Sequence, residues 1–119
     1  MITKTLKYSD GEIDATIEIG KANGRMGAKH GAMVEETRQF CKDSPGCDRF
    51  EIDARWSFTA VVPATLSVTG LPWPMTVEQF VNLPEELSDM WLDEARKLNM
   101  HWWKMPDTVD AQKKATSDT

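Results

Sequence analysis

The chain is poor in the residues that most often build catalytic or metal sites. Its 119 residues include two cysteines, two histidines and one tyrosine. Cys41 and Cys47 form a C-x5-C pair, a spacing typical of neither a zinc finger nor a redox motif. His30 and His101 lie far from both cysteines in the sequence. We therefore expect a reduced thiol pair, no metal site, no cofactor and no enzymatic activity.

The sequence also lacks a long hydrophobic run and a net positive charge. No apolar stretch approaches the ~20 residues that a helix needs to cross a bilayer, and the N-terminus has no apolar segment typical of a signal peptide. The net charge is −5, whereas binding to nucleic-acid phosphates requires clustered lysine and arginine. These features predict a cytoplasmic protein that binds neither membranes nor nucleic acid.

The length and composition are those of one small domain. Hydrophobic residues make up 40% of the chain and charged residues 28%, which is ordinary for a globular protein. We expect residues 1–106 to form a single globular domain. Residues 107–119 are polar, and we expect them to form a disordered tail.

The N-terminal part predicts a β-hairpin. Apolar and polar residues alternate over residues 13–19, the pattern of a half-buried strand. A similar alternation over residues 2–8 is interrupted by Lys4. Asp10-Gly11 between them is a common hairpin turn, because both residues accept positive φ. Ion pairs across the two strands would favour antiparallel pairing, and the candidates are Lys4, Lys7, Glu12, Asp14 and Glu18.

The segment from Gly20 to Gly31 is rich in glycine and basic residues. Lys21, Arg25 and Lys29 give it the composition of an anion-binding loop at a helix start. It matches neither G-x-G-x-x-G nor G-x4-G-K-[ST], the two common phosphate-binding patterns. We therefore favour a turn that leads into a helix. A small anion- or nucleotide-binding module that uses these three basic residues is the first alternative function.

Helical periodicity extends from Arg25 to Lys42. The residues that share one face are Met26, Met33, Val34, Thr37, Phe40 and Cys41. His30 falls on the same face, where a lone histidine is more often a residue at the edge of the core than a catalytic base. Asp43–Gly46 then ends the helix, because it combines serine, proline and glycine.

Residues 49–62 fit either a strand or a helix. Their alternate residues are apolar, which favours a strand. However, Asp48 and Glu51 have the spacing of a helix cap, and Glu51 and Arg55 have the i,i+4 spacing of a helical ion pair. A strand that continued through Val68 would be abnormally long. We therefore predict a helix to about residue 62, followed by an extended segment.

Two further helices are expected in the last third. Thr76 and Gln79 form a capping pair for a short helix that ends near residue 81. Asn82 or Leu83 should open the next helix, with Pro84 in its first turn, where the missing N–H costs nothing.

An apolar stripe marks the buried face of this last helix: Leu87, Met90, Trp91, Ala95 and Leu98. Asn99 is placed to cap its C-terminus. Six acidic and two basic residues between Thr76 and Asn99 predict a solvated acidic face. The fold class that follows is α+β, with an N-terminal β-hairpin followed by three to four helices in one small domain.

Four of the five tryptophans lie in the second half of the chain. Trp91 is expected in the core. Trp102 and Trp103 are adjacent, so they cannot both face the same core from one helix. Two prolines bracket Trp73 and should hold it extended, in a polyproline II form. Because tryptophan anchors interfaces and methionine adapts to them, we expect a partner-binding surface made of Leu71, Trp73, Met75, Trp102 and Trp103.

The run from Gly70 to Trp103 contains a series of short motifs: Gly70, Leu71, Trp73, Pro74, Thr76, Leu83–Leu87, Trp91, Asn99, His101 and Trp102. In this order they resemble the C-terminal signature of tail assembly chaperones of long-tailed phages and prophages. That family usually has proline where this chain has Met100. The N-terminal hairpin resembles the family only loosely, and residues 31–63 add little.

The resemblance implies a non-enzymatic role. Such chaperones bind the long, helical tape measure protein while the tail is built, in the cytoplasm of the host bacterium, and are absent from the mature virion. Many are also made as a longer, frameshifted form. The major tail protein and a second copy of the chain are further candidate partners. The second alternative function is a regulatory or antitoxin-like protein that uses the same tryptophans for another partner.

Overall fold

The computed structural model of this chain describes residues 1–103. The strands are β1 (Thr3–Ser9), β2 (Asp14–Gly20) and β3 (Thr65–Thr69), and the helices are α1 (Gly24–Asp43), α2 (Arg49–Val61), α3 (Val77–Val81), α4 (Glu85–Leu98) and the short 3₁₀ helix η1 (Met100–Trp103). The predicted α+β class is therefore confirmed, with a third strand added to the hairpin. The predicted domain boundary at residue 106 and the tail 107–119 lie outside the described residues.

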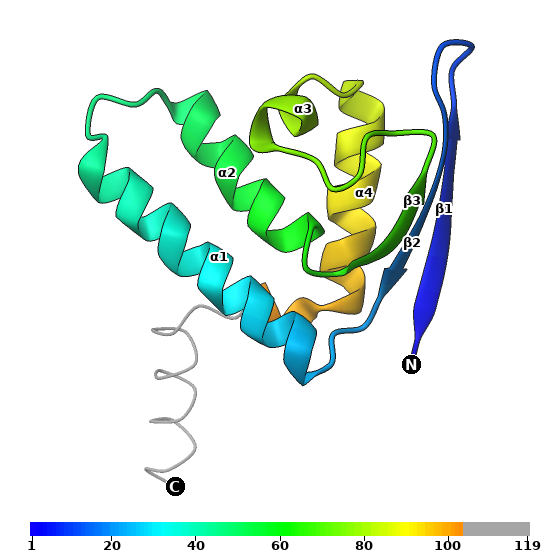
Figure 1. Cartoon of the computed structure of the whole chain (residues 1–119), viewed down its shortest axis with the longest axis horizontal. Coiled ribbons are helices and arrows are strands. Elements are labelled where there is room, and N and C mark those ends of the chain that lie inside the picture. The colour runs from blue at the N-terminus through cyan, green and yellow to red at the C-terminus, as the bar shows by residue number, and fades with distance from the viewer. Residues whose placement is uncertain (104–119) are drawn as a thin grey trace, which may run out of the picture.

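The elements are arranged in layers, with the sheet on one side and the helices on the other (Figure 1). The strands are antiparallel in the order β1-β2-β3. Helix α4 packs against β2, α2 packs against α4, and α1 packs against α2. Helix α3 contacts α2 and lies between the upper ends of α2 and α4 in Figure 1.

The predicted hairpin forms, with residues 10–13 as its loop, but of the Asp10-Gly11 pair only Gly11 has a positive φ. Gly11 has a φ of 93°, a conformation that glycine adopts without strain. One carboxylate oxygen of Asp10 accepts hydrogen bonds from the amides of Glu12 and Ile13, at 2.9 and 2.8 Å, and the other accepts one from the Tyr8 hydroxyl at 2.9 Å. The hydrogen bonds from the two backbone amides lower the pKa of Asp10 below its usual range, and the hydrogen bond from the Tyr8 hydroxyl adds to this effect.

The predicted cross-strand pairing of Lys4 is wrong. Lys4 faces Ile19 on β2, and Lys7 faces Thr16. Lys4 instead forms an ion pair with Glu94 on α4. This pair explains the charge within the apolar alternation of β1, because residues 4 and 6 share the face of the sheet that α4 covers.

Strand β3 completes the sheet through an irregular register. Glu18 pairs with Ser67 and Ile19 pairs with Thr65, so Leu66 is an extra residue on β3, as in a β-bulge. The strand ends before Gly70, which has a φ of 89°. A Cβ at Gly70 would lie 2.0 Å from the carbonyl oxygen of Asp14. Only glycine therefore fits at this end of the strand.

The preference for a helix over residues 49–62 is confirmed by α2. The Asp48 side chain accepts a hydrogen bond from the Glu51 amide at 2.8 Å, and Arg55 pairs with Glu51 at 3.0 Å. The apolar alternation that favoured a strand has no structural counterpart, since Phe50 is 67% exposed. Helix α1 likewise begins at a side-chain cap, Asn23, which accepts from the Met26 amide at 2.9 Å.

Helix α3 has the predicted capping box between Thr76 and Gln79. The predicted start of α4 is wrong by two to three residues: the helix begins at Glu85, and Pro84 is its N-cap. Asn82 instead caps the end of α3, where its side-chain amide donates to the Glu78 carbonyl at 2.8 Å. This bond holds residue 82 in the preceding helix, so α4 cannot begin there.

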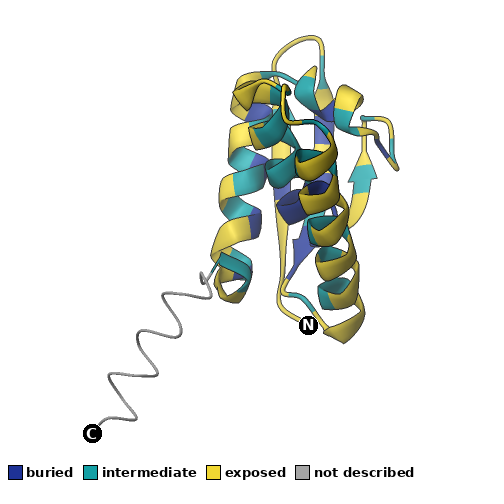
Figure 2. Ribbon diagram, turned by 90° about the vertical axis from the view of Figure 1, so that its left-hand side faces the viewer, coloured by how far each residue is buried: buried dark blue, intermediate teal, exposed yellow. Residues whose placement is uncertain are grey.

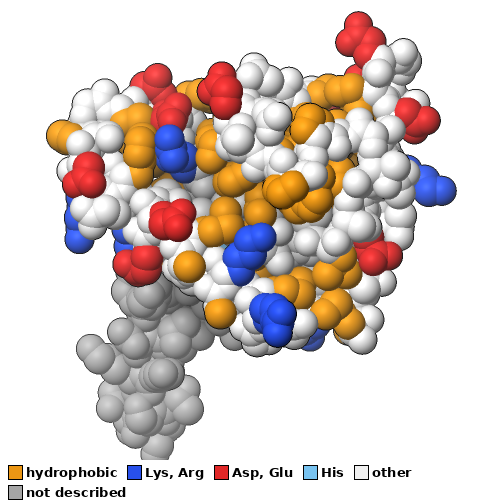
Figure 3. All heavy atoms as spheres, in the orientation of Figure 1, with side chains coloured by type: hydrophobic (Ala, Val, Ile, Leu, Met, Phe, Trp, Pro, Cys, Tyr) orange, Lys and Arg blue, Asp and Glu red, His pale blue; other side chains and the backbone are white. Residues whose placement is uncertain are grey.

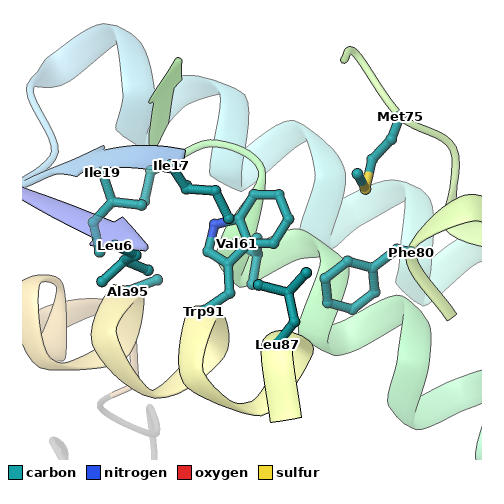
Figure 4. Close-up of a cluster of buried hydrophobic side chains, with 10 residues drawn as sticks. Leu6, Ile17, Ile19, Val61, Met75, Phe80, Leu87, Trp91 and Ala95 are labelled. Carbon is teal, nitrogen blue, oxygen red and sulfur yellow. The ribbon is translucent and has the colours of Figure 1, made fainter. Parts of the chain in front are cut away.

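The core lies between the sheet and the helices, and the exposed residues lie on their outer sides (Figure 2). Figure 4 shows the side chains that meet there: Leu6, Ile17, Ile19, Val61, Met75, Phe80, Leu87, Trp91 and Ala95. Trp91 is fully buried, as predicted. Its indole N–H donates to the Thr65 hydroxyl at 3.0 Å, which satisfies the one polar atom of a buried tryptophan.

Candidate functional site

The five residues predicted to bind a partner are divided between two places. Trp73 lies beside the middle of α4, with its ring centroid 6.0 Å from that of Trp91. Trp102 and Trp103 lie beyond the end of the same helix, in η1. Asn99 follows Trp91 by eight positions, a rise of about 12 Å along a helix. The single patch that the sequence suggested is therefore replaced by a corner and a separate tryptophan pair.

The corner after β3 encloses an apolar hollow of about 380 Å³. Its apolar lining comes from the hairpin, the corner and the loop after α3, through Ile13, Leu71, Pro72, Met75 and Leu83. Polar residues of α3, Glu78 and Gln79 among them, form the rim. On the face of the molecule seen in Figure 3, apolar side chains gather near the loop between β3 and α3.

Within this corner, Met75 and Trp73 contribute less free surface than the sequence suggested. Met75 is 7% exposed and belongs to the core, so it forms the floor of the hollow. Trp73 is half-buried and packs against the core. The Trp73–Pro74 peptide bond is cis, which differs from the all-trans polyproline II form that was predicted.

Trp102 has a partner within the chain. Its ring stacks on His30 of α1, with centroids 4.1 Å apart and planes 6° apart. The His30 Nδ1 lies 3.0 Å from the Thr59 carbonyl oxygen of α2, and because a carbonyl only accepts, Nδ1 carries the proton. His30 thus joins α1, α2 and η1, as expected for a histidine at the edge of the core.

Trp103 faces a different neighbour. The Arg96 guanidinium of α4 lies 4.5 Å from the centroid of the Trp103 ring, the geometry of a cation–π contact. The prediction that Trp102 and Trp103 cannot share one core face agrees with this arrangement. Each of the two rings already contacts another side chain of the same chain.

Asn99 has a role that the sequence only partly indicated. It caps α4, as predicted, but it is also fully buried. Its side-chain oxygen accepts from the Ala22 amide at 2.8 Å, and its side-chain nitrogen donates to the Gly20 carbonyl at 3.1 Å. These two hydrogen bonds link the end of α4 to the junction between β2 and α1.

The same junction bears on the anion-binding alternative. The amides of Gly20, Lys21 and Ala22 already donate to Ala64, Ile2 and Asn99, at 2.9, 2.8 and 2.8 Å. An anion-binding loop needs such amides to be free. The basic side chains Lys21, Arg25 and Lys29 are exposed, on a turn and the first part of α1. The segment is therefore a turn into a helix, as we favoured.

The remaining candidate groups are separate from the corner. Cys41 and Cys47 are half-buried and not bonded to each other, and burial raises the pKa of the Cys47 thiol, with a smaller effect from Glu51. Residues 1–103 contain no group of three or more His, Cys, Asp or Glu side chains that could hold a metal ion. No helix in this part of the chain is long and apolar enough to cross a membrane.

A groove between α2, α3 and α4 was not predicted. It has a volume of about 480 Å³ and lies beside Phe50. The signal in the sequence was the pattern of Phe50, Asp53, Ala54 and Ser57 at spacings of three and four residues, which places all of them on one face of a helix. Since the segment also fitted a strand, the sequence alone did not reveal that face.

Comparisons of the chain with protein-family models, with curated proteins and with solved structures find no match. The function must therefore be inferred from the residues and their geometry.

Proposed function

We propose that this protein is a tail assembly chaperone of a long-tailed phage or prophage, a non-enzymatic module that binds the tape measure protein during tail assembly. The observation that carries the proposal is the hollow at the Leu71–Met75 corner, inside the run that resembles this family. Its lining is largely apolar. Such a hollow suits an apolar side chain of a protein partner, whereas catalysis needs titratable groups that converge on a reacting atom.

The acidic character of the protein is consistent with this role. A net charge of −5 keeps a small binding protein soluble while it presents apolar surface. Under this proposal the protein acts in the cytoplasm of the host bacterium and is absent from the mature virion. The major tail protein and self-association are secondary possibilities for its contacts.

The test is co-expression with the tape measure protein of the same phage or prophage. We expect the two to co-elute in size-exclusion chromatography. Leu71→Asp places a charge in the hollow and should weaken the complex roughly thirtyfold or more, because burial of an uncompensated carboxylate is costly. Glu78→Trp places a bulky ring at the rim of the hollow and should also weaken the complex.

The matched control is Ile2→Asp, which makes a similar change at a residue that is 60% exposed and does not line the hollow. All variants must first show a cooperative melt like that of the unmodified protein. Absence of any complex with the tape measure protein would refute the proposal. A stable complex with a regulatory partner in its place would favour the antitoxin-like alternative.

A further inference from the structure

The groove between α2, α3 and α4 presents one unpartnered face of α2. Phe50 and Ala54 of α2 line one wall, and Glu85 and Asp89 of α4 line the opposite wall. Phe80 of α3 also lines the groove and is only 4% exposed, so it forms the floor. The groove thus combines an apolar floor with walls made by two helices.

Phe50 is the most exposed aromatic residue that borders this groove. It is 67% exposed and lies in the first turn of α2. A single exposed apolar residue is ordinary on a protein surface. Next to a groove with an apolar floor, however, a partner can cover the ring and the floor together. Aromatic residues in this position are frequent anchors of protein interfaces.

The charged residues that line the groove are all acidic: Asp53, Glu85 and Asp89. Glu85 and Asp89 are four residues apart on α4, a spacing at which like charges repel. Neither has an ion-pair partner within residues 1–103. Asp53 lies on the opposite wall and pairs with Arg49 at 3.1 Å. No lysine or arginine is among the residues that line the groove in this part of the chain.

We propose that this groove binds an amphipathic protein helix whose apolar stripe is flanked by lysine or arginine. The floor and Phe50 receive the stripe, as in other helix-in-groove complexes, and the carboxylates of Glu85 and Asp89 on the α4 wall receive the cations. A second copy of this chain fits less well, because its net charge is also negative. The inference rests on the proposed function only in taking the partner to be a protein.

Two synthetic peptides test this inference without the tape measure protein. Both carry the same leucine stripe on a helical frame, and the stripe is flanked by lysine in one and by glutamate in the other. Binding of each fluorescently labelled peptide to the full chain is measured by anisotropy at several salt concentrations. We expect the lysine peptide to bind roughly tenfold or more tightly than the glutamate peptide, with a preference that weakens as salt rises.

Variants then locate the binding site. Asp89→Lys puts a cation four residues after Glu85, a favourable order on a helix, so the fold is not weakened. It should reduce binding of the lysine peptide roughly tenfold and improve binding of the glutamate peptide. Its matched control is Glu12→Lys, the same charge change on the exposed hairpin turn, which should alter neither. Phe50→Ala should reduce binding of both peptides, whereas Met100→Ala, at a residue 61% exposed elsewhere, should not.

Several outcomes would overturn the inference. These are no binding of either peptide, equal binding of both, or equal losses with Asp89→Lys and Glu12→Lys. Self-association that Phe50→Ala abolishes, without peptide binding, would assign the groove to a second copy. Stronger peptide binding after Lys113→Glu and Lys114→Glu would assign it to the chain's own C-terminal segment. If the peptides fail but the tape measure complex forms, only the groove is refuted, and the reverse result refutes only the proposed function.

Discussion

Gly70 and Asn99 show how single residues of the C-terminal run serve the fold. Gly70 passes the Asp14 carbonyl so closely that a Cβ would lie 2.0 Å from its oxygen. Asn99 is fully buried and bonds to the backbone of Gly20 and Ala22. Both residues act on the hairpin, which lies far away in the sequence. Their presence in the run from Gly70 to Trp103 therefore has a structural reason, independent of any partner.

Gly70→Ala should destabilise the protein by more than about 2 kcal/mol. The added Cβ meets backbone, which cannot swing aside as a side chain can, and the positive φ is itself unfavourable for alanine. Thermal unfolding followed by circular dichroism measures the change. Gly46→Ala is the control, because no atom apart from its chain neighbours lies within 4 Å of the added Cβ. Equal melting temperatures for the two variants would contradict the close approach described here.

Asn99→Ala should cost about 2–3 kcal/mol, because it leaves the Ala22 amide and the Gly20 carbonyl without their partner in a buried site. Asn99→Asp retains the acceptor for the Ala22 amide but places a carboxylate next to the Gly20 carbonyl, so it should also destabilise. Urea titration of both variants measures the loss. Hydrogen exchange of the Ala22 amide should accelerate in Asn99→Ala, and an unchanged rate would show that the bond is not formed.

At the scale of elements, α1 contains three glycines. Gly24, Gly27 and Gly31 have no atom within 4 Å of an added Cβ apart from their own helix and chain neighbours. Glycine is roughly 1 kcal/mol less favourable than alanine within a helix. The helix therefore forms despite its composition, through the Asn23 cap and its packing against α2.

Gly27→Ala and Gly31→Ala should each stabilise the protein by up to about 1 kcal/mol, which corresponds to a rise in melting temperature of about 4–8 °C. Differential scanning calorimetry of the single and double variants measures the effect, and additive gains are expected because neither site is crowded. A fall in melting temperature would mean that α1 packs more closely around these positions than the structure indicates.

Elements with local signals could be predicted from the sequence, and those defined by distant partners could not. Helix α2 could be predicted because the Asp48 cap and the Glu51–Arg55 pair lie within one segment. An extended segment after it could also be predicted. Its pairing with β2 could not, since it depends on a register shift at Leu66 that no local pattern encodes. The start of α4 was misplaced because Asn82 and Pro84 suit more than one position near a helix end.

For the molecule as a whole, the pairing of β1 with α4 predicts a dependence of stability on pH. The hydrogen bond and charge of Lys4 lower the pKa of Glu94 below its usual range, with a smaller contribution from Lys97. A carboxyl with a lowered pKa in the folded state stabilises the fold above its unfolded pKa, near 4.3, and this stability is lost as pH falls through the lower folded pKa.

Glu94→Gln should therefore be less stable than the unmodified protein at pH 7, and the difference should shrink as pH falls from about 5 to about 3. Urea unfolding at a series of pH values measures this. Glu86→Gln is the control, since Glu86 is exposed and has no ion pair within residues 1–103. A difference between Glu94→Gln and the unmodified protein that is constant with pH would contradict the assignment.

The candidate site was partly predictable for a related reason. The concentration of tryptophan and proline after residue 70 indicated an aromatic corner, and Leu71, Pro72 and Met75 of that corner line the hollow, whereas Trp73 does not. The sequence could not show that Trp102 stacks on His30, because the two residues meet only when α1 and η1 are packed together. The groove beside Phe50 depends on three helices at once, so its acidic walls became visible only in the folded molecule.

The bonds of Asn99 also bear on the order in which the chain can fold while a ribosome makes it. The hairpin needs only the first twenty or so residues and can form as they emerge, since local pairs close quickly. The Ala22 amide, however, receives its acceptor only after residue 99 has been added and has left the ribosome. Until then the Ala22 amide and the Gly20 carbonyl lack the hydrogen bonds that the Asn99 side chain provides. Asn99, at the end of α4, thus completes the junction between β2 and α1, and a ribosome that stalls before residue 99 would hold a nascent chain in which this junction still lacks those hydrogen bonds.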